Sequence, residues 1–207
     1  MSGFGSGSTG ASVVNAAAYQ AGWFACVLGA AGGWGAAGAS IALTLALLHV
    51  VLAERPGREW PLLLAAAGVG AVADSLHAGF GILHFNGHEA GTLAPLWILA
   101  LWAQFGTTLH FSLRWLSRRY ALASLLGLLG GPLAFLGGER LGAASFGEPR
   151  ALSIAVLALS WAVALPVLVA IADRLGGVGR YRTSRRRRAR ELSKRAAPRL
   201  SGAAASR

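Results

Sequence analysis

Residues 152–172 read LSIAVLALSWAVALPVLVAIA, a run of 21 residues without a charged side chain. A helix that crosses a bilayer needs about 20 mostly apolar residues, because its backbone polar groups must be hydrogen-bonded inside the segment. The rest of the chain has the same character: 55% of the 207 residues are hydrophobic and 13% are charged, against about 25% charged in an average soluble domain. The composition therefore predicts a membrane protein.

Five further apolar stretches precede this one. They cover residues 13–31, 34–53, 61–85, 93–116 and 120–137. Together, the six stretches predict an all-α, polytopic transmembrane bundle over residues 13–172. A disordered lead is expected over residues 1–12 and a disordered basic tail over residues 173–207. The span over 120–137 contains Gly130-Gly131-Pro132, so it is either continuous or broken at that point. Paired glycines such as Gly127 and Gly131 are expected to permit close contact between helices.

The net charge of +11 is unevenly distributed along the chain. Up to Ala172 there are seven Arg against six acidic residues, whereas the last 35 residues carry twelve Lys or Arg against two acidic residues. The loops after the second and fourth spans are also basic, with Arg55, Arg58, Arg114, Arg118 and Arg119. Positively charged loops remain in the cytoplasm, so both termini are predicted to be cytoplasmic.

The tail contains the run Arg185-Arg186-Arg187-Arg188. A basic segment directly after a membrane span favours contact with anionic lipid head groups of the phospholipid bilayer. Nucleic acid is a less favoured partner, because only Tyr181 accompanies these arginines as a stacking residue. The single cysteine, Cys26, excludes a disulfide within the chain and any site built from several cysteines.

Several strings along the spans form a recognisable series. They include Asn15 with QAGWFACVLG at 20–29, PLW at 95–97, TTL at 107–109, GGPL at 130–133 and Trp161. In this order they resemble a family of bacterial inner-membrane proteins, domain of unknown function 2878, over about residues 13–175. The resemblance implies a fold type and an inner-membrane location. It implies no activity, and at most a setting in lipid metabolism.

Asp74 is the only acidic residue deep inside a predicted span, about 20 Å from Pro61 along the helix. An ionised carboxylate at that depth costs about 2.5–3.5 kcal/mol, so it must be protonated, paired or facing water. Two interpretations stay open. Asp74 binds a ligand or handles protons, or it forms a structural hydrogen bond to a partner such as Gln104, Thr107 or Ser75.

Histidines follow Asp74 along the same predicted span. At 100° per residue, His77, His84 and His88 lie on one helical face with Asp74, forming a polar seam towards the outer surface. Such a seam can carry protons or provide part of a metal site. His77 and His84 are too far apart to share one ion and no cysteine is near, so we predict no metal.

A second polar group lies at the cytoplasmic ends of the predicted spans. It consists of Tyr19, His49, Glu59, His110 and Arg114. His49 and His110 on different helices meet the minimum requirement for bis-histidine haem ligation. Polar residues at this depth more commonly cap helices or reach towards water, so we predict no cofactor. The tryptophans at 97, 102, 115 and 161 are expected in interfacial belts or facing lipid.

The sequence contains no hydrolase or nucleotide-binding motif. The preferred interpretation is an inner-membrane protein that binds a lipophilic ligand or a membrane-protein partner and supports lipid or envelope metabolism. The alternative is a membrane-embedded enzyme or small proton-coupled transporter that uses Asp74. In that case Asn15, Gln20 and Gln104 orient a polar head group within the same interior.

Overall fold

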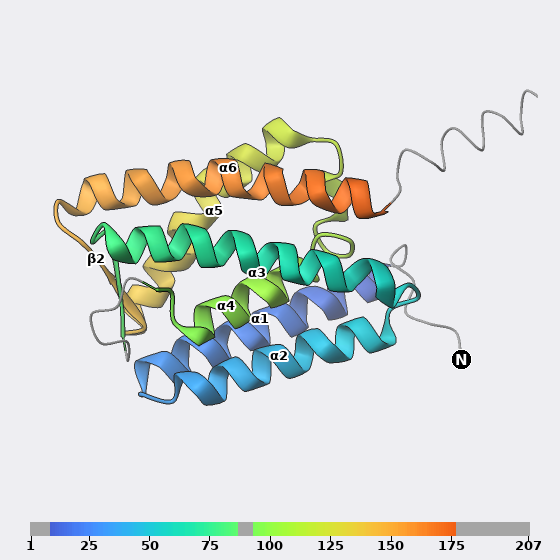
Figure 1. Cartoon of the computed structure of the whole chain (residues 1–207), viewed down its shortest axis with the longest axis horizontal. Coiled ribbons are helices and arrows are strands. Elements are labelled where there is room, and N and C mark those ends of the chain that lie inside the picture. The colour runs from blue at the N-terminus through green and yellow to red at the C-terminus, as the bar shows by residue number, and fades with distance from the viewer. Residues whose placement is uncertain (1–8, 87–92, 177–207) are drawn as a thin grey trace, which may run out of the picture.

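The computed structural model describes residues 9–86 and 93–176. Over these ranges the chain forms an antiparallel helical bundle with one small sheet (Figure 1). The elements are α1 (Thr9–Ala31), α2 (Gly35–Leu52), α3 (Pro56–Gly79), β1 (Leu83–Phe85), α4 (Leu96–Gly106), the 3-10 turn η1 (Arg114–Leu116), α5 (Tyr120–Arg140), β2 (Ala144–Phe146) and α6 (Arg150–Gly176). The predicted all-α class is confirmed, with a two-stranded sheet in addition.

The helices run between two ends of the bundle. The terminus end carries the starts of α1, α3 and α5 and the ends of α2 and α6 (Figure 1). There Arg58 Nη1 donates to the carbonyl of Gly176 at 2.9 Å, and Ser12 Oγ donates to the carbonyl of Phe111 at 3.4 Å. The opposite sheet end carries β1 and β2, which pair antiparallel. The described chain therefore begins and ends at the same end of the bundle.

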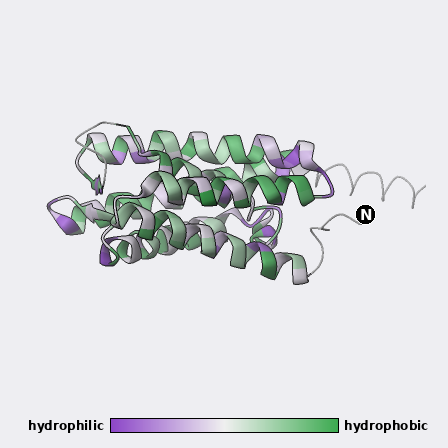
Figure 2. Ribbon diagram, turned by 90° about the horizontal axis from the view of Figure 1, so that it is seen from below, coloured by the Kyte–Doolittle hydropathy of each residue, from purple (hydrophilic) through white to green (hydrophobic). Residues whose placement is uncertain are grey.

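Five helices, α1, α2, α3, α5 and α6, are long and apolar enough to cross a membrane. The outward faces of α3, α5 and α6 carry large apolar side chains that are 64–69% exposed, including Leu64, Val72, Leu133, Leu159 and Val163. Hydrophilic residues gather mainly towards the two ends of the bundle (Figure 2). Soluble monomers rarely expose an apolar surface of this extent, and this distribution is the one expected of a multi-pass membrane protein.

The prediction of one continuous helix over residues 93–116 is wrong. α4 ends at Gly106 and is only about 16 Å long at 1.5 Å per residue. After it, the hydroxyls of Thr107 and Thr108 donate to the carbonyls three residues earlier, at 2.8 and 2.7 Å. Their backbone N–H groups bond to the same carbonyls. These tighter bonds end the α-helix, and the chain reaches α5 through turns and η1.

The third predicted span is displaced towards the N-terminus. The sequence prediction was 61–85, whereas α3 covers Pro56–Gly79. Gly81 takes a φ of 66°, a left-handed conformation that glycine adopts without steric cost. The N–H of Ile82 then bonds to the carbonyl of His77 at 2.8 Å. The helix therefore stops before the sheet instead of continuing through it.

This early end shortens the predicted polar seam. His77 does follow Asp74 on α3, and both are buried. His84 lies on strand β1 and is exposed, so it does not share the helical face of Asp74. His88 lies outside the described residues. A continuous line of histidines along one helix is therefore wrong for the described part of the chain.

The fifth span is continuous: α5 runs through Pro132 without a break. Its glycines pack against α6, because a Cβ at Gly127 would overlap the carbonyl of Trp161 and one at Gly131 would overlap its indole. The close approach predicted for this glycine pair is confirmed. The remaining predicted spans differ from α1, α2 and α6 only by a few residues at their ends.

Candidate functional site

Seven aromatic side chains from four helices line one pocket. They are Tyr19 and Trp23 of α1, Trp97, Trp102 and Phe105 of α4, Phe135 of α5 and Trp161 of α6. The other lining residues are also uncharged: Val27, Ile98, Leu101, Ala134, Gly138, Ala143 and Ala144. The pocket opens to the surroundings, and its cavity volume is about 50 Å³. We call it the aromatic pocket.

The rings of α4 and α6 form one packed wall of this pocket. The indoles of Trp102 and Trp161 stack with centroids 4.5 Å apart and an interplanar angle of 18°. Phe105 packs edge-on to both, at 6.1 and 5.7 Å. Trp97 and Trp102 are only 5% and 4% exposed. Their predicted interfacial or lipid-facing placement is therefore wrong, because both face the interior of the bundle.

Asp74 holds the central indole of this wall. Its Oδ2 accepts a hydrogen bond from Trp102 Nε1 at 2.7 Å, and its Oδ1 lies 3.0 Å from His77 Nδ1. The Asp74 side chain is fully buried. The indole fits against α3 because residue 70 is glycine, and a Cβ there would overlap the ring of Trp102. The carboxylate thus fixes the orientation of a residue that lines the aromatic pocket.

A chain of hydrogen bonds extends from Asp74 to α6. His77 Nε2 lies 2.9 Å from Ser160 Oγ, and the Ser160 hydroxyl donates to the carbonyl of Val156 at 2.9 Å. Since that hydroxyl has one hydrogen, Nε2 must be the donor to Oγ. One further proton is then shared between Nδ1 of His77 and Oδ1 of Asp74. The pair is neutral overall wherever that proton resides, which suits its burial.

The five residues predicted for one polar interior do not all converge. Asp74 and His77 lie together, as predicted, with Trp102 as a partner that the sequence did not reveal. Gln104 donates from Nε2 to the carbonyl of Ala18 at 2.9 Å, between α4 and α1. Asn15 lies at the terminus end and Gln20 is exposed on α1. None of these three is bonded to Asp74: Gln104 faces α1, Asn15 faces the segment after α4, and Gln20 is exposed.

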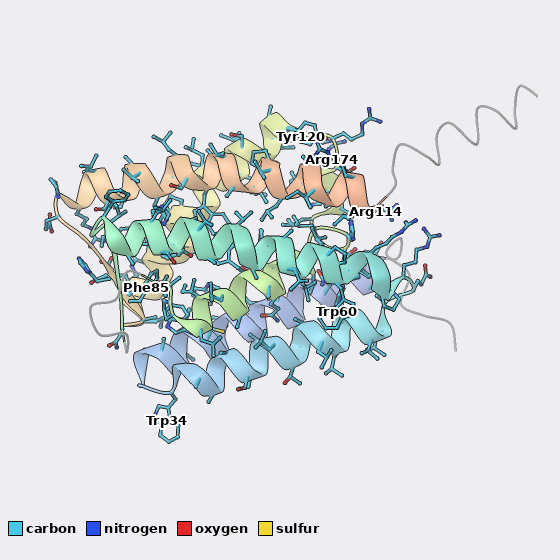
Figure 3. All side chains as sticks on the ribbon, viewed as in Figure 1. Trp34, Trp60, Phe85, Arg114, Tyr120 and Arg174 are labelled. Carbon is cyan, nitrogen blue, oxygen red and sulfur yellow. The ribbon has the colours of Figure 1, made fainter. Side chains whose placement is uncertain are left out.

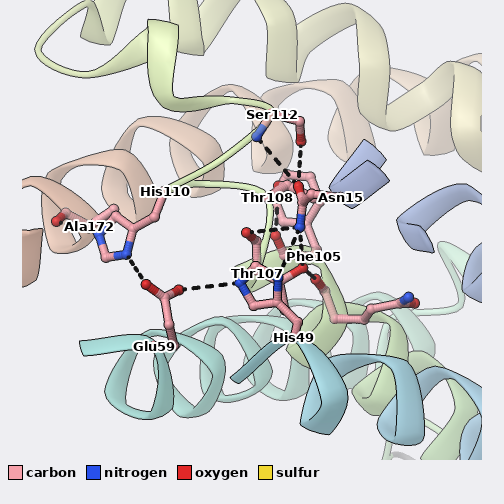
Figure 4. Close-up of polar contacts among 10 residues, drawn as sticks. Asn15, His49, Glu59, Phe105, Thr107, Thr108, His110, Ser112 and Ala172 are labelled. Atoms are coloured by element: carbon pink, nitrogen blue, oxygen red, sulfur yellow. Dashed lines mark hydrogen bonds and ion pairs between the residues drawn. The ribbon is translucent and has the colours of Figure 1, made fainter. Parts of the chain in front are cut away.

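Asn15 instead fixes the non-helical segment that follows α4 (Figure 4). Its Nδ2 donates to the carbonyl and hydroxyl of Thr107 at 3.3 and 3.2 Å. Its Oδ1 accepts from the hydroxyl and the backbone N–H of Ser112, at 2.8 and 3.4 Å. One buried amide therefore satisfies polar groups that a regular helix would otherwise pair internally.

The predicted cluster at the terminus end does form around Glu59 (Figure 4). Its Oε1 lies 3.0 Å from His110 Nδ1, and its Oε2 lies 3.7 Å from His49 Nε2. The second nitrogen of His110 lies 3.0 Å from the carbonyl of Ala172 on α6. Glu59 thus links α3 to α2, and through His110 to α6. The cluster therefore holds the segment after α4 in place at the terminus end.

The other two predicted members of this cluster are Tyr19 and Arg114. Tyr19 lines the aromatic pocket, where its ring packs edge-on to Phe105 at 5.6 Å. Arg114 is at the terminus end on η1 (Figure 3). The predicted lipid-contacting run, Arg185 to Arg188, falls outside the described residues.

His110 has no free ring nitrogen for haem ligation in this structure. Both ring nitrogens of His110 are engaged with Glu59 and Ala172, whereas His49 Nε2 lies 3.7 Å from Glu59 and has no hydrogen-bond partner among the described residues. A haem needs a free imidazole nitrogen from each ligand. Within residues 9–86 and 93–176, no group of three or more His, Cys, Asp or Glu is arranged to hold a metal ion.

Comparison with known proteins places the chain in a family. No curated protein and no solved structure matches it. Residues 12–167, about three quarters of the chain, match the family model described as "Protein of unknown function (DUF2878)". The match includes the aromatic pocket, Asp74, His77 and the Glu59 cluster, so these features lie in the shared region. The protein therefore belongs to the DUF2878 family, as its sequence strings indicated.

Proposed function

We propose that the protein is a bacterial inner-membrane protein that binds a lipophilic ligand in its aromatic pocket and supports lipid or envelope metabolism. The observation that carries the proposal is the pocket's lining: seven aromatic side chains from four helices and no charged group. Ligand sites are typically concave and lined by apolar and aromatic side chains. A buried carboxylate also holds Trp102 in the wall, so the lining is fixed before any ligand arrives.

The test compares a variant whose pocket is filled by a larger side chain with a matched control variant on the same helix. In α5, Ala134 lines the pocket and the neighbouring Leu133 is 67% exposed on the outer face. A lipophile is expected to co-purify with the unaltered protein in mild detergent and to be detected by mass spectrometry. Ala134→Trp should abolish that signal, whereas Leu133→Trp should retain it. Equal signals from both variants would contradict the proposal.

The proposed arrangement in the membrane has six crossings and both termini in the cytoplasm. The fourth crossing then consists of α4 and the segment that Asn15 and Glu59 hold. Arginines support this orientation: Arg114 and Arg174 lie at the terminus end (Figure 3). At the sheet end, Arg150 is neutralised by two hydrogen bonds to Glu139, at 2.9 and 2.6 Å. The basic tail is proposed to contact anionic lipid head groups on the cytoplasmic side.

Orientation is tested with a reporter fused to the C-terminus. We expect no signal from alkaline phosphatase, which is active only outside the cytoplasm, and full fluorescence from a green fluorescent protein at the same position. The positive-inside rule is the physical reason, since the tail carries an excess of ten positive charges. Strong phosphatase activity would overturn both the six-crossing arrangement and the proposed lipid contact of the tail.

A second candidate is a membrane-embedded enzyme or proton-coupled transporter. The observation that favours it is the chain of contacts from Ser160 through His77 to Asp74 inside the bundle. Aspartate and histidine in membrane interiors commonly form proton relays. The variant Asp74→Asn separates the two candidates, because it keeps a hydrogen-bonding side chain but removes its titration.

A further inference from the structure

Three of the four tryptophans that line the aromatic pocket have a buried indole nitrogen, and these three differ in their hydrogen bonding. Trp102 Nε1 donates to Asp74 at 2.7 Å. The Nε1 atoms of Trp97 and Trp161 are also buried, yet neither has a hydrogen-bond partner among the described residues. Native proteins leave few buried donors unpaired, because each one loses its bond to water without replacement. Trp97 and Trp161 therefore differ from Trp102 in that their indole N–H groups are unpaired within the described part of the chain.

An indole nitrogen restricts the chemistry of a complementary ligand. It donates one hydrogen bond and accepts none, so the matching ligand atom is an acceptor. No charged side chain lines the pocket, and a charged ligand would lose its hydration without gaining a counter-charge. The complementary ligand therefore carries a neutral hydrogen-bond acceptor. On a lipophilic molecule, the strongest common neutral acceptor is a carbonyl oxygen.

We propose that the aromatic pocket takes a neutral lipophile whose carbonyl oxygen accepts a hydrogen bond from the indole N–H of Trp161, with Trp97 as the second donor. This inference rests on the proposed function and adds the chemical class of the ligand. Trp161 is the primary donor because its ring is fixed on both sides, by stacking on Trp102 and by Gly131 of α5. Quinones and fatty-acyl esters both supply such a carbonyl.

The test compares probes that differ in the carbonyl. The full chain in detergent micelles is titrated calorimetrically with decylubiquinone, with methyl oleate and with 8-heptadecene, a hydrocarbon without a carbonyl. At least one carbonyl probe should bind about 3–10-fold more tightly than the hydrocarbon, as expected for one neutral hydrogen bond. Preference for the quinone or for the ester identifies which source of the carbonyl fits the pocket.

Phenylalanine variants assign the donor. Trp161→Phe keeps an aromatic ring but lacks the N–H. The ratio of the carbonyl-probe affinity to the hydrocarbon affinity should therefore fall towards one, while the hydrocarbon affinity stays the same. Trp97→Phe should reduce the preference less. Trp60→Phe is the control, since Trp60 is 46% exposed on α3 and lies outside the pocket lining. It should leave every affinity unchanged.

A spectroscopic readout is independent of protein stability. With ¹⁵N-labelled tryptophan, the indole N–H resonance that disappears in Trp161→Phe should shift downfield when the carbonyl probe binds, and should not do so with the hydrocarbon. If all probes bind equally and no variant changes their ratio, the carbonyl inference is wrong while the lipophile-binding function stands. If no probe binds, the proposed function fails and the inference fails with it.

Discussion

Asp74→Ala is expected to destabilise the protein by about 3–5 kcal/mol, the cost of removing one partner from a buried ionic or hydrogen-bonded group. The variant leaves Trp102 Nε1 without its acceptor and His77 Nδ1 without its carboxyl partner, and both atoms are buried. Asp74→Asn should cost only about 1 kcal/mol, because its amide offers an oxygen to Trp102 and an N–H to His77. Thermal denaturation in detergent, followed by tryptophan fluorescence, measures the difference.

The control for this pair is Val72→Ala, which alters an exposed residue of the same helix. Its denaturation temperature should be close to that of the unaltered protein. Equal losses of thermal stability in Asp74→Ala and Asp74→Asn would mean that the carboxyl's hydrogen bonds do not stabilise the wall of the pocket. The Asp74→Asn variant also separates the two functional candidates. In a complementation assay, a lipophile-binding protein retains activity after this substitution, whereas a proton-handling protein loses activity at a normal level in the membrane.

Gly131→Ala is expected to lower the denaturation temperature by about 2–12 °C, while Gly130→Ala, one residue earlier, is expected not to lower it. A methyl group at Gly131 overlaps the Trp161 indole, whereas one at Gly130 meets no atom within 4 Å. Overfilling a packed interior costs about 1–3 kcal/mol, and each kcal/mol shifts the midpoint of a protein of this size by about 2–4 °C.

The adjacent pair provides its own control, because both substitutions replace glycine by alanine within α5. Any change in helix propensity is therefore common to the two variants. Gly131→Ala should also weaken ligand binding, since the added methyl group displaces the Trp161 indole from its position against Trp102. Identical behaviour of the two variants would show that α5 does not approach α6 through Gly131.

Much of the fold could be predicted from local composition. The long apolar runs became helices, and Gly127 and Gly131 mark the close contact of α5 with α6. The runs over 93–116 and 61–85 were misplaced for the same reason: hydropathy reports how apolar a segment is, not where its helical hydrogen bonds stop. At Gly106 the following threonine hydroxyls compete for the carbonyls, and at Gly81 the backbone turns left-handed.

The candidate site could be predicted only in part. Asp74 and His77 were found because ionisable residues inside a span are rare, and His49, Glu59 and His110 because they share one depth. The aromatic wall was missed, since a tryptophan in an apolar helix carries no sign of whether it faces lipid or protein. The pairing of Asp74 with Trp102 would have required knowing that Gly70 leaves space for an indole.

The sequence by itself determined that this chain is an all-helical membrane bundle of the DUF2878 family, because runs of this length and apolarity satisfy their backbone only as helices in lipid. Tertiary structure alone decided how the non-helical segment after Gly106 is held and what Asp74 does. Those outcomes depend on contacts between distant residues, 92 positions apart for Asn15 with Thr107 and 28 for Asp74 with Trp102. Such contacts exist only once the helices have packed.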